Sequence, residues 1–287
     1  MRTLPVLFLI TLSIPVSSNR LETTRSGSII VCIVGNTYVV CVADSQITDM
    51  THGNKHSLGC KLIALGQKTL FEGLGHEKIG FGDGRVWDTF QTAKRVYRNA
   101  TDKSAESLAN DWTQSTSDWL KSYPPETLQQ LLPKHPRDPS NSEGIADAVF
   151  VGFDESYHPF SYPYVQTRHI LFDRDSGKLF SRIKNTEIGT AGESIATGIE
   201  EDAAAAFTQG KINGRNLQKD MNLAISAVQY VFDHATGDEK DELGPPIDVG
   251  VLTSDGITWP EGKRKPSCYA QDLKEDPPKK QQPEKKK

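Results

Sequence analysis

The sequence predicts an α+β protein in which two antiparallel sheets are stacked between layers of helices. The chain opens with two consecutive hairpin patterns, at residues 27–45 and 61–75. Strands and helices then follow one another in blocks, without the strand–helix alternation that builds a parallel sheet. The 287 residues, of which 36% are hydrophobic, are enough to form a buried core.

The first hairpin consists of two apolar runs joined by a Gly-Asn turn, and it contains two of the four cysteines. A four-residue loop at 35–38 would put Cys32 directly opposite Cys41, so that a disulfide could form. A two-residue turn would leave the two cysteines diagonal and too distant. Small buried cysteines are an equal alternative. Because no CxxC pair occurs, we expect no zinc site, and nothing in the sequence indicates a cofactor.

Helices are expected in two blocks. A long helical region is predicted over residues 85–132, where Pro124 and Pro125 break it. Three strands then follow a polar, Pro-rich loop. A second helix is predicted over residues 213–234, with apolar residues along one face. A hairpin around Asp255-Gly256 completes the pattern.

The two ends of the chain differ from its middle. Arg2 precedes a short apolar run, and small residues follow at the spacing that signal peptidase accepts. We expect a secretory signal at 1–18 and a short propeptide at 19–27, hence a secreted or periplasmic protein. The apolar run is shorter than the roughly 20 residues of a membrane span, so we expect no stable membrane anchor. Residues 263–287, rich in Lys, Pro and Gln, are predicted to form a disordered basic tail.

The charge of the chain bears on its partners. The formal net charge is −4, and the lysines cluster only near the end of the chain. Nucleic-acid binding requires a concentrated basic face, so we do not expect this partner.

Residues capable of catalysis follow the hairpins in order. Ser28 heads the first strand, Asp44 follows the second strand, and Lys61 opens the third. An N-terminal serine can use its own α-amine, with a pKa of about 7.7–8.0, as the base that activates its hydroxyl. A nearby lysine ammonium lowers the pKa of that amine and favours the alkoxide, and an aspartate keeps the lysine charged.

This order resembles the start of a proteasome β-type subunit, a member of the N-terminal nucleophile (Ntn) hydrolase superfamily. The similarity extends over most of residues 27–259. It implies a four-layer αββα sandwich over residues 28–262 and autocatalytic cleavage between Gly27 and Ser28. The processed serine would then hydrolyse peptide or acyl-amide bonds, supported by Asp44 and Lys61. A homo-oligomer is a further expectation.

Two segments depart from the family pattern. Where the family has a Gly-Ser-Gly-Ser segment, we match residues 189–194, which read GTAGES. We assign backbone N–H groups here, that of Gly192 among them, to an oxyanion hole, with Ser194 as substitute support for the amine. Near the end, Asp241 retains the family aspartate in a secondary supporting role, while Gly244 replaces the family serine.

Two rival interpretations use the same residues. One is a non-catalytic exported module that keeps the fold for binding or assembly, and the missing serines favour it. The other is a serine hydrolase whose nucleophile, Ser194, lies in a Gly-x-Ser-like turn with His234 as its partner. His52 and His56 could be metal ligands, but no third ligand stands out, and we expect no metal there.

Overall fold

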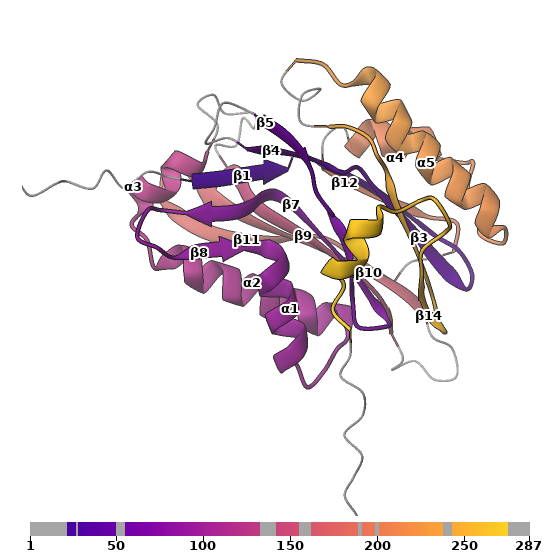
Figure 1. The fold of residues 1–287 in the computed structure, drawn as a ribbon, viewed down its shortest axis with the longest axis horizontal. Coiled ribbons are helices and arrows are strands. Elements are labelled where there is room, and N and C mark those ends of the chain that lie inside the picture. The colour runs from indigo at the N-terminus through magenta and orange to yellow at the C-terminus, as the bar shows by residue number, and fades with distance from the viewer. Residues whose placement is uncertain are drawn as a thin grey trace, which may run out of the picture.

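The computed structural model describes the chain in eight ranges, and its structure is given for them alone: 22–26, 28–49, 55–132, 142–154, 162–188, 191–198, 201–237 and 243–274. Within them the chain forms two antiparallel sheets with helices packed against them (Figure 1). The predicted signal sequence at 1–18, Gly27 and Asp241 lie outside the described residues.

The larger sheet has nine described strands, in the order β11-β10-β9-β7-β1-β4-β5, and β6 and β8 also pair with β7. Its strands are β1 (Glu22–Ser26), β4 (Gln46–Asp49), β5 (Lys55–Leu58), β6 (Leu62–Leu65), β7 (Thr69–Gly80), β8 (Val86–Asp88), β9 (Ser142–Asp154), β10 (Tyr162–Asp173) and β11 (Lys178–Ile188). The long strand β7 lies at the centre of this sheet and pairs with four strands, β1, β6, β8 and β9.

The smaller sheet has the order β12-β2-β3-β13-β14. Its strands are β2 (Ile29–Val34), β3 (Tyr38–Ala43), β12 (Ser194–Gly198), β13 (Asp248–Thr253) and β14 (Gly256–Thr258). The last pair of the β2–β3 hairpin is Val34 with Val39, so four residues form its loop. This register puts Cys32 directly opposite Cys41, and a disulfide joins them across a Cα–Cα distance of 4.1 Å.

The described helices are α1 (Thr89–Asn99), α2 (Ala105–Lys121), α3 (Pro125–Leu128), α4 (Glu201–Thr208) and α5 (Leu217–His234), with 3-10 turns η1 (Gln129–Leu131) and η2 (Pro266–Gln271). The first predicted helical block, 85–132, begins with strand β8 and divides into α1, α2 and α3, whereas the second, 213–234, is the single helix α5. Side-chain caps define the starts of α1, α2 and α5, where Asp88, Ser104 and Asn216 each accept a backbone N–H from the first turn. Among the described helices, none is long and apolar enough to cross a membrane.

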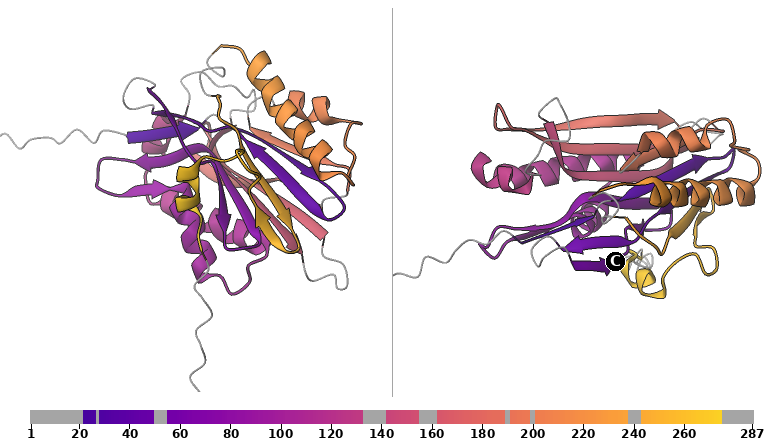
Figure 2. Two further views of the ribbon diagram at one scale, coloured as in Figure 1. Left: turned by 45° about the vertical axis from the view of Figure 1, so that its right-hand side comes forward. Right: turned by 90° about the horizontal axis from the view of Figure 1, so that it is seen from above.

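Three apolar clusters explain why the strands are hydrophobic on both faces. One lies between the larger sheet and helices α1 and α2, and includes Phe71 and Trp112. A second lies between the smaller sheet and helices α4 and α5. The third joins the two sheets, with Leu70 and Val39 among its members. Figure 1 and the left view of Figure 2 show α1 and α2 on one side of the strands and α4 and α5 on the other.

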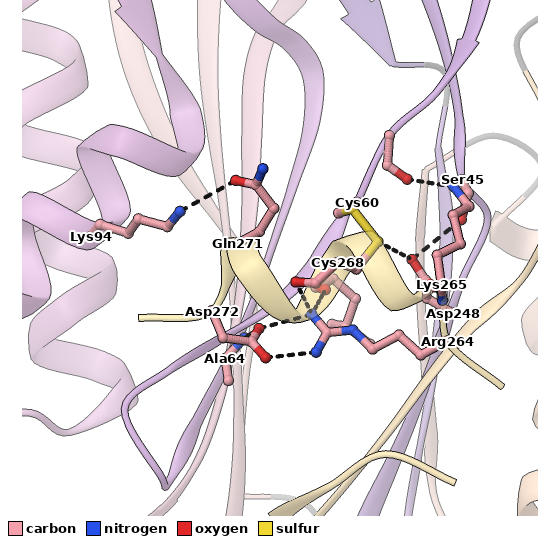
Figure 3. Close-up of a disulfide and its surroundings, with 12 residues drawn as sticks. Ser45, Cys60, Ala64, Lys94, Asp248, Arg264, Lys265, Cys268, Gln271 and Asp272 are labelled. Carbon is pink, nitrogen blue, oxygen red and sulfur yellow. Dashed lines mark hydrogen bonds and ion pairs between the residues drawn. A yellow bond between two sulfur atoms is a disulfide. The ribbon is translucent and has the colours of Figure 1, made fainter. Parts of the chain in front are cut away.

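The folded chain extends beyond the predicted boundaries at both ends. Residues 22–26, expected in the propeptide, form β1, which pairs with β7 on one side and β4 on the other. Residues 263–274, expected in the tail, are held by a Cys60–Cys268 disulfide and by Arg264, whose guanidinium bonds the Asp272 carboxylate (Figure 3). The segment is ordered by these specific contacts and not by apolar content, since Arg264 is buried while most of its other polar residues are exposed, so its composition did not predict its order.

Candidate active site

Ser28 lies directly before β2 and is 2% exposed. Strand β12 runs beside it, with Gly198 opposite Ile29 in the register. A Cβ atom added to Gly198 would lie 1.9 Å from the Ser28 carbonyl oxygen, and the Gly198 φ is +116°. Both facts require glycine, so the close contact between these two backbones depends on Gly198.

Asp44 fixes the backbone on which Ser28 is placed. Its carboxylate accepts a hydrogen bond from the Ile29 N–H at 3.2 Å, and Ile29 is the residue after Ser28. The Asp44 N–H in turn donates to the Ile29 carbonyl at 3.3 Å. Asp44 also accepts from the Gln46 N–H at 3.2 Å. Asp44, which follows β3, is therefore hydrogen-bonded to Ile29, the first residue of β2.

Lys61 pairs with Asp44 as the sequence predicts. Its Nζ lies 2.9 Å from Oδ1 and 2.8 Å from Oδ2, and both side chains are 0% exposed. Burial raises the pKa of Asp44, while the charge and hydrogen bonds of Lys61 act in the opposite direction. The buried Asp44–Lys61 ion pair can therefore hold the positive charge of the Lys61 ammonium in place beside the start of β2.

A second buried acidic residue, Asp248, contacts Ser45, the residue after Asp44, and the sequence analysis did not identify it. Asp248 begins β13, is 0% exposed, and accepts hydrogen bonds from the Ser45 hydroxyl at 3.3 Å and from the Lys265 N–H at 3.4 Å (Figure 3). Burial raises the pKa of Asp248, and these donors and the Lys265 charge oppose the shift. Its position, an aspartate heading an apolar strand, is the signal that could have found it.

Gly244 reaches the site from the segment before β13. Its N–H donates to Asp44 Oδ2 at 3.4 Å, and its carbonyl accepts the Ser45 N–H at 3.3 Å. A Cβ here would come 2.3 Å from Oε1 of Gln46. The segment thus meets Asp44 through the backbone of a glycine that is packed against Gln46. Asp241, three residues earlier, is outside the described residues.

Gly192 and Ser194 do not lie beside Ser28, so their assignment to the oxyanion hole and to support of the amine is wrong. Strand β12 is antiparallel to β2, and Ser194 pairs with Ile33. At about 3.3 Å per residue, Ile33 is roughly 13 Å along the strand from Ile29. The Gly192 N–H already donates to the Val34 carbonyl at 2.8 Å.

The residue of this region that meets Ser28 is instead Gly198, at the other end of β12. In sequence, residues 198–201 read Gly-Ile-Glu-Glu. The Glu201 carboxylate accepts the Gly198 N–H at 3.3 Å. Like residues 189–194, this stretch of sequence contains no Gly-Ser-Gly-Ser pattern.

The alternative pair of Ser194 and His234 is not formed. The Ser194 hydroxyl hydrogen-bonds Thr208 Oγ1 at 2.6 Å. Nδ1 of His234 lies 2.8 Å from the Tyr230 carbonyl, one turn back in its own helix. His52 and the side chain of His56 are outside the described part of the chain. In the part described, no three His, Cys, Asp or Glu side chains gather as a metal site would require.

Comparison with protein-family models finds none that matches this chain, and comparison with curated proteins finds no matching relative. The class of protein must therefore be inferred from the geometry of Ser28, Asp44 and Lys61 and from the arrangement of the sheets.

Proposed function

We propose that the chain is an exported Ntn hydrolase of four-layer αββα fold that cleaves peptide bonds through Ser28. The observation that carries the proposal is the Asp44 carboxylate, which accepts hydrogen bonds from both the Lys61 ammonium and the amide next to Ser28. The division of the core into one cluster between the sheets and one under each pair of helices supports the layered fold.

In the proposed maturation, the hydroxyl oxygen of Ser28 attacks the carbonyl carbon of Gly27. The peptide C–N bond breaks, the hydroxyl proton passes to the nitrogen, and an ester forms between the two residues. Water then hydrolyses this ester, which leaves a carboxylate on Gly27 and a free α-amine on Ser28. This amine is the base in the reaction that follows.

In the proposed reaction, the α-amine takes the proton of the Ser28 hydroxyl as the oxygen attacks the substrate carbonyl. The proton passes to the leaving amine, and water hydrolyses the acyl-enzyme. Lys61 stabilises the negative charge that develops, and Asp44 holds Lys61 ionised and oriented. General-base assistance of this kind contributes about 10²–10⁴-fold to the rate.

Strand β1 supports peptides as the substrate class. It leads directly to the proposed scissile bond and adds to the larger sheet between β4 and β7, with Thr24 opposite Asp49 and Ser26 opposite Gly75. The chain's own first substrate would therefore be recognised by backbone pairing. An extended peptide can form the same hydrogen bonds, whereas a small acyl amide cannot.

Intact-mass measurement with N-terminal sequencing tests the maturation. We expect a mature chain starting at Ser28, and an uncut chain for Ser28→Ala. Ser254→Ala, on the exposed turn after β13, is the matched control and should be processed normally. Active material that starts upstream of residue 28 would contradict the α-amine mechanism.

Turnover is tested with chains made to begin at residue 28. Against a panel of peptides and acyl amides, Ser28→Ala and Lys61→Ala should each lose at least about 10²-fold in kcat/KM, the scale of the base and charge effects. Retained turnover in Ser28→Ala would point to another nucleophile, with Ser194 the first to test.

The second candidate is a non-catalytic exported module that uses the fold for binding or assembly. Two observations favour it: Ser28 is 2% exposed, and both segments that meet the site lack the family serines. An uncut chain, together with no turnover by any chain beginning at residue 28, would establish this alternative.

A further inference from the structure

Glu72 is a buried acid that the proposed reaction does not use. It lies on β7, is 0% exposed, and neither of its carboxylate oxygens has a hydrogen-bond partner in the described part of the chain. Ionised carboxylates are almost never buried without a partner, because the loss of hydration is not compensated. An unpartnered Glu72 at this position is therefore expected to be a neutral carboxylic acid.

The register of the larger sheet puts Glu72 next to the candidate active site. It pairs with Leu62 on β6, the residue that follows Lys61, and with Val149 on β9. Leu62, Val149 and the β7 residue Leu70 all belong to the cluster between the two sheets. Because side chains two apart on a strand share a face, Glu72 enters the same layer as Leu70.

The charged groups that act on Glu72 include Asp44 and Lys61 of the candidate active site. Burial raises the pKa of Glu72 well above 4.5, the nearby Asp44 raises it further, and the Lys61 ammonium lowers it; Asp248 and Glu77 add smaller increases. On β9, beside β7, Asp147 is already paired with His169 of β10 at 2.8 Å.

We propose that Glu72 is a positioning residue for Lys61: as a neutral acid it leaves the Lys61 ammonium to Asp44, and on ionising it draws that ammonium away. Two carboxylates cannot both hold one buried ammonium without repelling each other. Ionisation of Glu72 therefore weakens the contact between Lys61 and Asp44 and sets the alkaline limit of activity. The activity part rests on the proposed function, while the coupling of the three side chains does not.

A stability measurement tests the coupling without any activity. In the unfolded chain Glu72 ionises near pH 4.5, whereas in the folded chain it keeps its proton to higher pH. The folded state then binds more protons, so stability falls as pH rises from about 4.5 through the pKa of folded Glu72. One proton changes the unfolding equilibrium constant by up to tenfold per pH unit. Asp44 and Asp248 contribute with the same sign, so the comparison must be made against a Glu72 variant.

We expect the ratio of wild-type to Glu72→Gln unfolding constants to rise by up to tenfold per pH unit over this range. Glu72→Leu serves the same purpose if Glu72→Gln does not fold, and the exposed Glu126→Gln is the matched control. The infrared difference spectrum of wild type minus either Glu72 variant should contain the carbonyl band of a neutral carboxylic acid, since any contribution of Asp44 and Asp248 is common to both proteins. A ratio independent of pH, or no such band, would overturn the proposal.

Asp44→Asn distinguishes positioning from simple burial. Removing the Asp44 charge frees Lys61 to stabilise ionised Glu72, so the pH range of the effect should move down. An unchanged range would mean that Glu72 is not coupled to the pair, and would overturn the proposal. In active enzyme, Glu72→Gln should extend the alkaline limb of kcat/KM at unchanged KM. If no form is active but the pH effect moves with Asp44→Asn, the proposed reaction fails while the positioning of Lys61 by Glu72 stands.

Discussion

The Cys60–Cys268 disulfide should contribute more to stability than the Cys32–Cys41 disulfide. The two bridges close loops with sequence separations of 208 and 9 residues. In the chain-entropy model, in which the loss is 2.1 + 1.5R ln n cal/mol/K, these lengths correspond to about 5.4 and about 2.6 kcal/mol at 25 °C. Removing the long-range bridge should therefore cost roughly twice as much as removing the hairpin bridge.

The measurement is urea unfolding of the wild type, Cys60→Ala/Cys268→Ala and Cys32→Ala/Cys41→Ala under oxidising conditions. Wild type unfolded in the presence of a reductant provides the sum of both losses without any change in side-chain packing. Equal losses for the two double variants, or a larger loss for the hairpin pair, would refute the reasoning. That result would mean that contacts such as Arg264 with the Leu62 carbonyl, and Asp272 with the Ala64 N–H, keep the C-terminal segment in place in the denatured ensemble.

Two further predictions concern the site. At a pH where Glu72 keeps its proton, Asp44→Asn should lower the free energy of unfolding by about 3–5 kcal/mol, because it leaves the buried Lys61 ammonium without a charged partner, and adding Lys61→Met should recover part of the loss. A coupling energy below about 1 kcal/mol in this double-mutant cycle would contradict a tight buried pair. Gly198→Ala should slow processing before Ser28, and it should destabilise the chain by more than Gly192→Ala does. Gly192 is the matched control because it also has a positive φ, but a Cβ added there has nothing within 4 Å. Equal effects of the two substitutions in both assays would show that the contact between Gly198 and Ser28 is not needed.

The antiparallel sheets and the pairing of Asp44 with Lys61 were predictable because they depend on local patterns. Hairpins fix the register of adjacent strands, and the ends of β3 and the start of β6 both follow from short apolar runs. The position of β12 was not predictable in the same way. Sequence order does not say which end of a strand meets Ser28, and the GTAGES segment was matched on its likeness to a Gly-Ser-Gly-Ser segment, whereas Gly198 makes the contact.

Glu72 and Asp248 were missed for a different reason. An acid within an apolar strand normally marks the solvent face of a half-buried sheet. Here both faces of β7 and β13 are covered, so alternation carries no information about exposure. The Cys60–Cys268 bridge lies beyond local reasoning altogether, since its partners are 208 residues apart.

Strand β1 has a consequence for how a processed enzyme would become active. While Gly27 and Ser28 are joined, β1 is tethered to the sheet at an effective concentration in the millimolar range, as for any short linker. Cleavage would remove the tether, and the strand, five residues long, would be held only by its pairing with β4 and β7. Its occupancy would then follow the actual concentration of the released peptide. Dilution would clear the site, and a concentrated sample would retain its own product there.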